Sequence, residues 1–565
     1  MFIVVGRAGD GRTAVQRLDD SGSALGDSEA VTDLAAFVRA EEHAAGPRWA
    51  WGDTGAWYPD ILAGGVRVRR CHDLRLSRAI LQRSALTDAV DAGSDTYWDR
   101  PLEVPSSRPD SLFELEAEHG AAPDTRGLAE CVAELQRQLG MLGAASEQGR
   151  LALLLAAESA GALIAVEMTA AGLPWDAGVH DEVLTGLLGP RVPHGQRPRR
   201  MRELLEQIRT ALDDPSANPD SPADLLRSLQ RAGIMVESTR AWQLREIEHP
   251  VRGPLLEYKK LARLLSANGW SWMDQWVLDG RFRAEYVPGG VVTGRWATRG
   301  GGALQLPKQV RAAVRADPGW KLVVADAAQL EPRVLAALSR DEAMANDARG
   351  RDLYAGIVAA GAVDSRAHAK MALLGALYGA TTGESGRLLP RLARAYPRAF
   401  GLVEEAARAG ERGECVTSRL GRTSPPPGRE WLTIQARANG PEASAADERR
   451  ARSAARDWGR FTRNFVVQAS AAEWALSWMA GLRNRLGTLS APNPGSLEDS
   501  VFAGTPHLVF FLHDEIIVHT PAELADDVVA AVTDAAAAAG RLLFGDFPVD
   551  FPLDLAVVDS YSEAE

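Results

Sequence analysis

Two apolar strand patterns that each end in carboxylates constrain this sequence more than any other feature. The first runs from Lys321 to Ala325 and is followed by Asp326. The second begins at Val509 and reads VFFLHDEIIVHTP, so Asp514 and Glu515 interrupt an apolar run. An unpaired charge in such a run is very costly, so the carboxylates either face water or hold a cation. If the two strands are neighbours in one sheet, Asp326 and Asp514 meet although 188 residues separate them.

A pair of carboxylates of this kind suits a hard divalent cation. Magnesium prefers oxygen ligands and keeps waters and substrate phosphates in its shell. Two such ions about 4 Å apart can activate an attacking oxygen and stabilise a leaving one in phosphoryl transfer. A single aspartate at a strand end is more often a cap or turn residue, so the metal hypothesis depends on both strands. Glu331, five residues beyond Asp326, lies at the predicted start of a helix.

The segment Ser365–Tyr378 has the pattern of a helix with a distinctive polar face. Arg366, Lys370, Leu374 and Tyr378 recur every four residues and therefore share one face. That face is about 18 Å long. Two cations followed by an apolar and an aromatic residue could contact a triphosphate at one end and a base at the other. A partly solvated amphipathic helix without a ligand is the alternative.

Length and composition indicate a soluble, multidomain, cytoplasmic protein. The chain has 565 residues, of which 46% are hydrophobic and 24% charged. Its three cysteines lie far apart, which argues against disulfides or a zinc site and suits a reducing compartment. The first residues lack the pattern of a signal peptide. The longest apolar stretch, Leu151 to Val166, is interrupted by Glu158 and Ser159, so we expect no membrane span.

The charge is unevenly distributed along the chain. The net charge is −12, but Val251 to Trp320 holds 11 Lys and Arg against 5 Asp and Glu. This sector therefore carries +6 and the remainder −18. An acidic body with one basic sector can bind a polyanion there and repel it elsewhere. A solvated helix face followed by a loop would give the same count.

Periodicity and punctuation predict the other elements. We expect strands at Phe2–Val5, Trp49–Trp51, Leu508–Val518 and Leu553–Val558. We expect helices at 149–173, 225–234, 255–265, 332–338, 466–486 and 524–543. The run from Ser424 to Arg456 is predicted to be a loose excursion, that is, an irregular segment without regular secondary structure.

Three ordered segments resemble motifs A, B and C of the family A DNA polymerases. Motif A resembles D-Y-S-Q-I-E-L-R, which here reads DAAQLEPR from Asp326 to Arg333. Motif B resembles R-x3-K-x7-Y-G, formed by Arg366, Lys370 and Tyr378–Gly379. Motif C is His513-Asp514-Glu515 between apolar strands. Shorter matches, at 256–268, 293–305, 413–422 and 460–468, extend the resemblance over roughly residues 150 to 565.

The resemblance implies a role for each matching residue. Asp326, Asp514 and the Ala327 carbonyl would hold two magnesium ions, with Glu515 as a lesser acid. The implied nucleotide-binding residues are Arg366, Lys370, Leu374, Tyr378, Glu331, Gln329 and Tyr354, and Lys370 is also implied in catalysis. The implied DNA-binding residues are Arg295, Gln305, Arg460, Asn464, Gln468, His513, Lys259, Lys260 and Arg263. The implied partners are a primed DNA template and deoxynucleoside triphosphates, with no membrane, and the protein would act as a monomer.

Several positions depart from the family pattern. Leu374 stands where the family has Phe or Tyr, the ring that packs on the incoming sugar. Ala327 replaces the motif A tyrosine that supports Glu331. Tyr354 stands where a histidine helps to hold the triphosphate. Because these positions contact the sugar or the triphosphate in the family, or support a residue that does, the departures are expected to affect sugar selection and catalytic rate.

The resemblance also implies the fold, an α/β and α+β multidomain architecture. An RNase H-like, exonuclease-type domain at 1–145 would precede a right-hand polymerase with an antiparallel palm sheet and helical thumb and fingers. The palm and thumb would begin at 146–290, with motif A in 291–340, fingers at 341–455 and motif C in 456–565. The family's 3′–5′ exonuclease needs several metal-binding acids. No Asp-x-Glu follows Phe2–Val5 and no Tyr-x3-Asp lies near Cys131. Asp73 would be the relic of one of these acids, and one carboxylate does not hold two metal ions. We therefore expect a degenerate, inactive exonuclease-like domain, and no 5′-nuclease domain.

Three other hypotheses remain open at this point. A bifunctional 3′–5′ exonuclease and polymerase would shorten primers when nucleotides are absent. A non-catalytic DNA-binding relic would have no use for the Asp326 and Asp514 pair together with Lys370. A soluble α/β protein whose motifs are accidental is the third.

Overall fold

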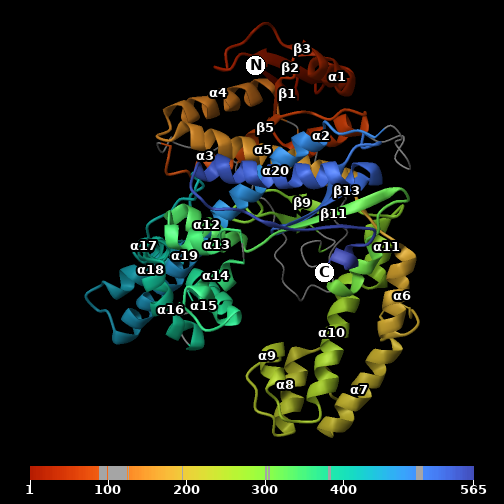
Figure 1. Cartoon of the computed structure of the whole chain (residues 1–565), viewed down its shortest axis with the longest axis vertical. Coiled ribbons are helices and arrows are strands. Elements are labelled where there is room, and N and C mark those ends of the chain that lie inside the picture. Colours follow the sequence, from red (N-terminus) through yellow and green to blue (C-terminus); the bar gives the residue numbers. More distant parts are fainter. Residues whose placement is uncertain are drawn as a thin grey trace. The chain divides into compact units, whose positions relative to one another are not determined.

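The chain combines helices and strands, and its contacts divide it into two compact units (Figure 1). The computed structural model describes residues 1–87, 98, 124, 126–193, 195–299, 302, 306–350, 352–379, 383–491 and 501–564. Unit 1 comprises Met1–Ala170, Tyr286–Arg299 and Val323–Ala556. Unit 2 comprises Ala171–Glu285, Gly300–Leu322 and Val557–Glu565. Each unit is assembled from segments that are distant in sequence, and the five linear domains expected from the sequence stay a prediction.

The N-terminal part of unit 1 contains a five-stranded sheet of order β3-β2-β1-β4-β5. Its strands are β1 (Phe2–Arg7), β2 (Thr13–Leu18), β3 (Glu29–Ala30), β4 (Arg48–Trp51) and β5 (Cys71–Asp73). Strand β1 pairs antiparallel with β2 and parallel with β4. Its apolar run is buried on both faces because helices cover the sheet. The predicted strands at Phe2–Val5 and Trp49–Trp51 are confirmed.

In the described part of this region, five helices accompany the sheet. They are α1 (Leu34–Ala44), α2 (Thr54–Ala63), α3 (Leu74–Leu81), α4 (Leu128–Ala144) and α5 (Gln148–Ala171). Helix α4 packs on the sheet through Leu128, Cys131 and Leu135, which join Val4 and Ala50 in one core. Helix α5 confirms the predicted long apolar helix. By length and composition alone it could cross a membrane, but 72% of its most apolar window is buried inside the protein.

The second sheet of unit 1 has the order β12-β13-β11-β14. Its strands are β12 (His507–Leu512), β13 (Glu515–Pro521), β11 (Trp320–Ala327) and β14 (Leu553–Val558). The single strand expected at Leu508–Val518 is wrong, because β12 and β13 form an antiparallel hairpin with Leu512 opposite Glu515. The tight turn requires a positive φ at His513, which is 60°. Without a glycine at this position, the sequence pattern did not indicate the turn.

A helical group lies between the two halves of this sheet in sequence (Figure 1). Its helices are α12 (Leu330–Ser339), α13 (Glu342–Ala348), α14 (Leu353–Ala359), α15 (Arg366–Tyr378), α16 (Gly383–Ala395), α17 (Pro397–Glu411), α18 (Arg429–Ala438) and α19 (Ala445–Leu486). The loose excursion expected at Ser424–Arg456 is wrong, because it contains α18 and the start of α19. Alanine, arginine and glutamate favour helix, and Ser444 with Asp447 forms a capping box. Helix α20 (Ala525–Phe544) packs against α19.

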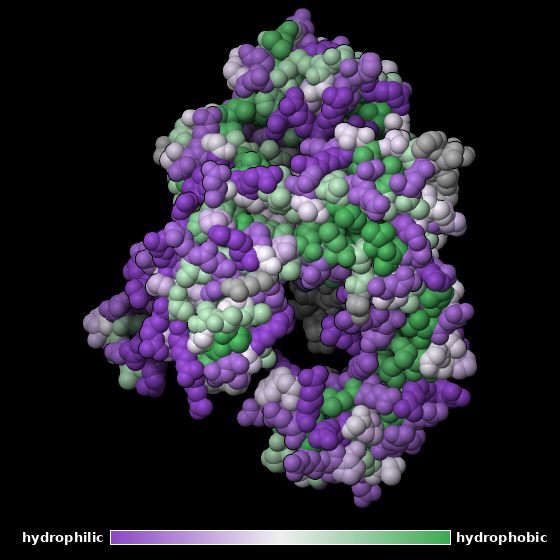
Figure 2. All heavy atoms as spheres, viewed as in Figure 1, coloured by the Kyte–Doolittle hydropathy of each residue, from purple (hydrophilic) through white to green (hydrophobic). Residues whose placement is uncertain are grey.

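Unit 2 is mainly helical. Its helices are α6 (Ala177–Leu188), α7 (Arg199–Leu212), α8 (Pro222–Arg231), α9 (Ala241–Arg245), α10 (Arg252–Asn268) and α11 (Trp270–Trp276). Short strands β6 (Leu173–Pro174), β8 (Arg281–Phe282) and β7 (Val277–Leu278) form its small sheet. Hydrophilic residues cover most of the visible face of α7 to α10 (Figure 2). The apolar residues of α10 and α7 pack against each other, which leaves the polar sides to solvent. In unit 1, β9 (Glu285–Val287) pairs with β10 (Ala297–Arg299).

Candidate active site

The two predicted carboxylate strands are neighbours in the second sheet, since β13 lies next to β11. Asp326 lies near the end of β11, and Asp514 lies in the β12–β13 turn. The backbone N–H of Ala327 donates a hydrogen bond of 2.9 Å to the carbonyl of Asp514. This bond joins the two chain segments at the residues that carry the chemistry. The sheet therefore brings Asp326 and Asp514 together, as the sequence predicted.

The electrostatics at this point favour a cation. Burial, followed by the negative charge of Asp326, raises the pKa of Asp514 to about 7. Two carboxylates that repel each other in a partly buried site are stabilised by a positive ligand. Glu515 is half-buried and begins β13. Ala327 is buried, and its carbonyl belongs to the same strand end as Asp326.

Glu331 is the centre of a hydrogen-bond network beside the two aspartates. It lies in the first turn of α12, as predicted. The Tyr378 hydroxyl donates to Glu331 at 2.9 Å, and the Arg295 guanidinium forms an ion pair with the same carboxylate. Burial, followed by the charge of Glu331, raises the pKa of Tyr378, and Gln468 also hydrogen-bonds its hydroxyl. The network connects the segment between β9 and β10, helix α12, the end of α15 and helix α19.

Helix α15 presents the predicted polar face. Ser365 caps its start by accepting the His368 backbone N–H, and Gly379 ends it at φ 71°. Arg366, Lys370 and Tyr378 are exposed, while Leu374 is half-buried on the same face. The other side of the helix, which includes Ala369, Leu373 and Ala376, is buried. Among the residues that the structure describes, Lys370 has no ion-pair partner.

Arg366 has a partner that the sequence did not suggest. Its Nε and Nη2 atoms donate to one oxygen of Asp352 at 3.2 and 2.7 Å. Gln329 donates to the same oxygen at 2.7 Å and accepts the Leu353 N–H. The Arg366 guanidinium also lies 5.5 Å from the centre of the Tyr354 ring. Asp352 therefore holds Arg366 in place, and its only sequence signal was an aspartate before an apolar helical run.

Helix α19 carries the remaining predicted contacts of unit 1. Arg460 forms an ion pair with Asp457, and its stem packs against Gly379 at the end of α15. The Oδ1 atom of Asn464 is buried without a hydrogen-bond donor among the residues that the structure describes. His513 is exposed at the tip of the hairpin. These residues and Gln468 remain candidates for contact with a ligand that lies along α19.

Three further predicted DNA-binding residues belong to unit 2. Lys259, Lys260 and Arg263 lie on α10 of unit 2. Burial lowers the pKa of Lys259. Gln305 falls outside the described residues. The predicted roles of these four residues are not tested by the structure.

A family model described as DNA polymerase family A matches residues 195–562, which is more than half of the chain. The chain belongs to DNA polymerase family A.

Curated relatives in this family are distant and longer than the matched region. DNA polymerase I of Thermus filiformis is 25% identical over 340 residues, covering 55% of this chain and 36% of the relative. DNA polymerase I of Thermus aquaticus is 26% identical with the same coverage. DNA polymerase I of Chloroflexus aurantiacus is 29% identical over 180 residues, or 28% of this chain and 19% of the relative. The match thus spans about a third of the Thermus proteins.

A solved structure shares the fold of this family A chain along its whole length. It is the polymerase domain of Pol1 from M. smegmatis, in complex with DNA primer-template and dNTP. The TM-score is 0.69 at 18% identity, and the alignment covers all of this chain and 95% of the other. At this identity the likeness concerns the fold alone.

Several residues that support the site were missed by sequence reasoning. Arg333 is buried, and its guanidinium donates to the carbonyls of Ala328 and Ala348 and to Asp550, so it fixes the start of α12. Arg463 donates to the Ala376 carbonyl at 3.0 Å and thereby ties α15 to α19. Arg333 ends the segment that resembles motif A, but that match did not indicate its buried contacts, and Arg463 has no local pattern that separates it from the exposed arginines of α19.

Proposed function

We propose that the protein is a DNA-directed DNA polymerase that extends a primer 3′-hydroxyl on a DNA template with deoxynucleoside triphosphates. The observation that carries the proposal is the approach of Asp326 and Asp514 across adjacent strands, beside Glu331, which accepts a hydrogen bond from Tyr378 of α15. Family A membership supports the same reaction. The polymerase complex with primer-template and dNTP that shares this fold adds support for the two substrates.

The residues present fit a divalent metal site. Asp326, Asp514 and the Ala327 carbonyl all offer oxygen atoms, and the raised pKa of Asp514 reflects burial and then the charge of Asp326, both of which a bound cation would offset. We propose that these residues hold two magnesium ions and that Glu515 tunes the site from β13. When bound, the ions supply Lewis-acid activation of the attacking oxygen and neutralise charge on the leaving group.

The protein's own side chains bind and orient the triphosphate. Lys370 and Arg366 are exposed cations one helical turn apart, so they can contact successive phosphates and offset the charge that grows on pyrophosphate. Arg366 must release Asp352 before its guanidinium can bind the triphosphate. Gln329 and Tyr354 flank that contact and keep the guanidinium near the site.

Glu331 is placed to select the sugar. Its carboxylate is held by Tyr378 and Arg295, so it cannot turn away from an incoming nucleotide. An additional 2′-hydroxyl would meet this fixed group, and we propose that ribonucleotides are excluded there. Leu374 offers a smaller apolar surface to the sugar than the aromatic ring that the family usually has at this position.

Duplex DNA would contact both units. Arg295, Gln305, Arg460, Asn464, Gln468 and His513 would contact the nascent pair or its backbone. In the minor groove the acceptor pattern is similar for all correct pairs, so such contacts check shape rather than sequence. Lys259, Lys260 and Arg263 of α10 would neutralise phosphates. Binding through them weakens as the salt concentration rises.

We propose that the N-terminal sheet is an exonuclease-type domain without exonuclease activity. Its strand order and its parallel and antiparallel pairings support an RNase H-like topology. Its acids are engaged structurally. Asp73 caps α3 and accepts from Thr54, Asp53 pairs with Arg75, and Asp124 pairs with Arg126.

Primer extension by the purified protein tests the polymerase proposal. With magnesium and nucleotides, the wild type should lengthen a labelled primer, whereas Asp514→Ala should lose about 10³-fold or more of the rate because the metal site is broken. Asp526→Ala is the matched control, since Asp526 is an exposed acid on α20. Absence of extension by the folded wild-type protein would refute the proposal.

The same labelled primer tests the exonuclease proposal. Incubation with magnesium but without nucleotides should leave the primer intact. A ladder of shortened primers that persists in Asp514→Ala would show a working nuclease in the N-terminal domain and would overturn the inactive assignment.

A further inference from the structure

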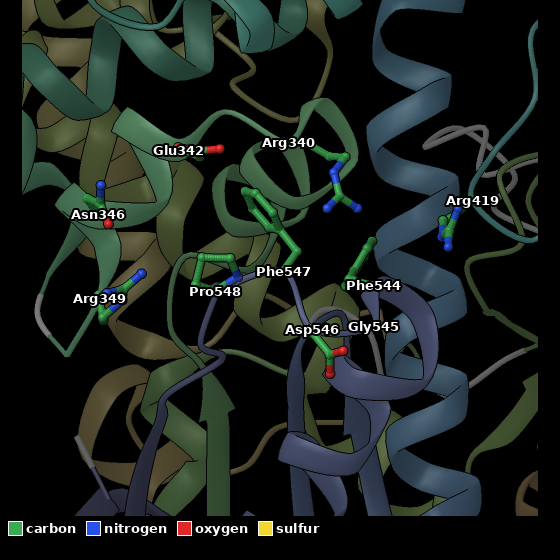
Figure 3. Close-up of a pocket in the computed structure, with 10 residues that line it drawn as sticks. All are labelled: Arg340, Glu342, Asn346, Arg349, Arg419, Phe544, Gly545, Asp546, Phe547 and Pro548. Atoms are coloured by element: carbon green, nitrogen blue, oxygen red, sulfur yellow. The ribbon is translucent and has the colours of Figure 1, made fainter.

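A cavity of about 600 Å³ lies in unit 1 away from the two aspartates (Figure 3). Its lining residues are Arg340, Glu342, Asn346, Arg349, Arg419, Phe544, Gly545, Asp546, Phe547 and Pro548. Arg340 follows the end of α12, the ten-residue helix whose first turn carries Glu331. Ten residues of helix span about 15 Å, so the cavity is a separate site.

Three arginines from three different parts of unit 1 line this cavity. Arg340 follows α12, Arg349 follows α13, and Arg419 belongs to the loop before α18. Among the residues that the structure describes, none of the three guanidinium groups forms an ion pair. The lining also holds the acids Glu342 and Asp546, so the three arginines give it a small excess of positive charge.

The surroundings of Arg419 show that this potential is built into the fold. Its Nε donates to the carbonyl of Leu543 at the end of α20, and its own carbonyl accepts from Arg150. Burial, and then the positive charges of Arg150 and Arg340, lower the pKa of Arg419 although two glutamates act against this. The guanidinium is therefore held partly buried beside Arg150, and an anion would offset the cost of burying its charge.

Arg340 is held at the cavity by its backbone and by an aromatic ring. It caps α12 in the left-handed conformation, with φ 50°, where glycine is the usual residue. Its guanidinium lies 5.4 Å from the centre of the Phe547 ring. In the view of Figure 3, Arg340 and Arg419 lie on one side of Phe547, whereas Arg349 and Asn346 lie on the other. The cavity thus has a cationic region on each side of an apolar surface.

We propose that this cavity binds a phosphate-bearing ligand of nucleotide size at a site separate from the catalytic one. Guanidinium groups match phosphate oxygens in geometry and charge. The volume is within the range of small-ligand sites. Asn346, Glu342 and Asp546 offer hydrogen-bond partners to hydroxyl or amino groups, and Phe547 and Pro548 offer an apolar contact for a ring. The phosphate can belong to free pyrophosphate, to a nucleotide or to a DNA end.

Calorimetric titration of the full chain with inorganic pyrophosphate, in the presence of a chelator, tests the proposal. The protein should carry Arg366→Ala and Lys370→Ala, so that the proposed catalytic phosphate contacts are absent. Binding should persist in this background. It should weaken about tenfold when Arg340→Gln or Arg349→Gln is added, because each removes charged hydrogen bonds. Arg408→Gln is the matched control, since Arg408 is an exposed arginine of α17 remote from the cavity lining.

Two further titrations distinguish the source of the phosphate. Tighter binding of dATP than of pyrophosphate, sensitive to Arg349→Gln, would indicate a free nucleotide. Tighter binding of a 5′-phosphorylated single strand would indicate a DNA end. If none of the three probes binds at millimolar concentration, or if both substitutions leave binding unchanged, the proposal is wrong. Arg340→Gln and Arg349→Gln should retain primer extension, so this result is independent of the polymerase proposal.

Discussion

At the scale of single residues, the environment of a side chain decides its role more than its identity does. Asp73, Asp326 and Asp514 all lie at strand ends or turns. Asp73 is fully buried and satisfied by backbone and hydroxyl donors, so it is structural. Asp514 faces another carboxylate, so it is a candidate metal ligand. The sequence alone treats the three alike, because the difference is the set of neighbours that the fold supplies.

Leu374→Phe should improve nucleotide use. An aromatic ring at this half-buried position of α15 would pack on the incoming sugar, a contact worth about 0.5–1.5 kcal/mol. We expect kcat/KM for dNTP incorporation to rise about two- to tenfold. Steady-state single-nucleotide incorporation measures this change. Leu374→Met, which conserves volume without adding a ring, should leave the value near that of the wild type, and an equal gain in both variants would contradict the ring explanation.

Glu473 should make the stability fall as the pH rises. Burial raises its pKa to about 7, although the Ser418 hydroxyl and Leu420 N–H donate to it. The folded value exceeds the ordinary value of 4.5, so ionisation between these two values costs folding free energy. Glu473→Gln cannot ionise. The free energy of unfolding of the variant, relative to that of the wild type, should therefore rise by about 3 kcal/mol between pH 4.5 and pH 7.

Urea denaturation of both proteins at several pH values measures this difference. The buried carboxyl is the only group changed, so all other titrations cancel in the comparison. A difference that stays constant with pH would show that Glu473 is already ionised in the fold at low pH.

At the scale of elements, the ends of helices position the site. Helix α12 begins at the motif A residues and helix α15 ends at Gly379, next to Arg460 of α19. The sequence predicted both helices within a few residues, since caps and periodicity are local signals. It did not predict that Gln329 adopts a positive φ or that Asp352 holds Arg366, because these features need a partner from another element.

Gly379→Ala should weaken both the fold and the site. The glycine has φ 71°, and a Cβ would lie 2.7 Å from the Cγ of Arg460. The left-handed conformation alone costs about 1 kcal/mol in alanine, and displacement of Arg460 adds to this. We expect a loss of about 2 kcal/mol in the free energy of unfolding and slower primer extension.

Gly361→Ala provides the matched control for this substitution. Gly361 follows the end of α14, has φ 74°, and no atom lies within 4 Å of a Cβ built there. It should lose only the conformational cost and retain normal extension. Equal losses in the two variants would show that the contact with Arg460 does not matter.

At the scale of the whole molecule, buried ion pairs join distant segments of unit 1. Glu167 of α5 accepts from Arg483 of α19, from Arg67 and from the Tyr58 hydroxyl. Arg483 also donates to the carbonyls of Val68 and Arg69. Burial disfavours the charge on Glu167, but Arg483 and Arg67 together hold its pKa well below the ordinary value. These contacts therefore join the N-terminal part of unit 1 to helices α5 and α19.

Arg483→Met should destabilise this unit strongly. It leaves Glu167 buried with one cation fewer, and loss of one partner from a buried pair costs about 3–5 kcal/mol. Urea denaturation followed by tryptophan fluorescence measures the effect. Arg485→Met is the control, because Arg485 is less buried and bonds only the Gly481 carbonyl among the described residues. A loss below about 1 kcal/mol for Arg483→Met would contradict the proposed role of Arg483 in joining these segments.

The sequence by itself determined several elements of this protein and indicated the residue types of a candidate site. Apolar periodicity predicted β11, α12, α15, α20 and β14, and residue types indicated carboxylates for metal and cations for phosphate. The fold decided which of these residues meet. The β12–β13 turn at His513, the adjacency of β13 to β11, and the burial of Glu167 and Glu473 all depend on contacts between segments far apart in the chain. Local patterns record propensity, whereas burial and pairing are properties of the assembled structure.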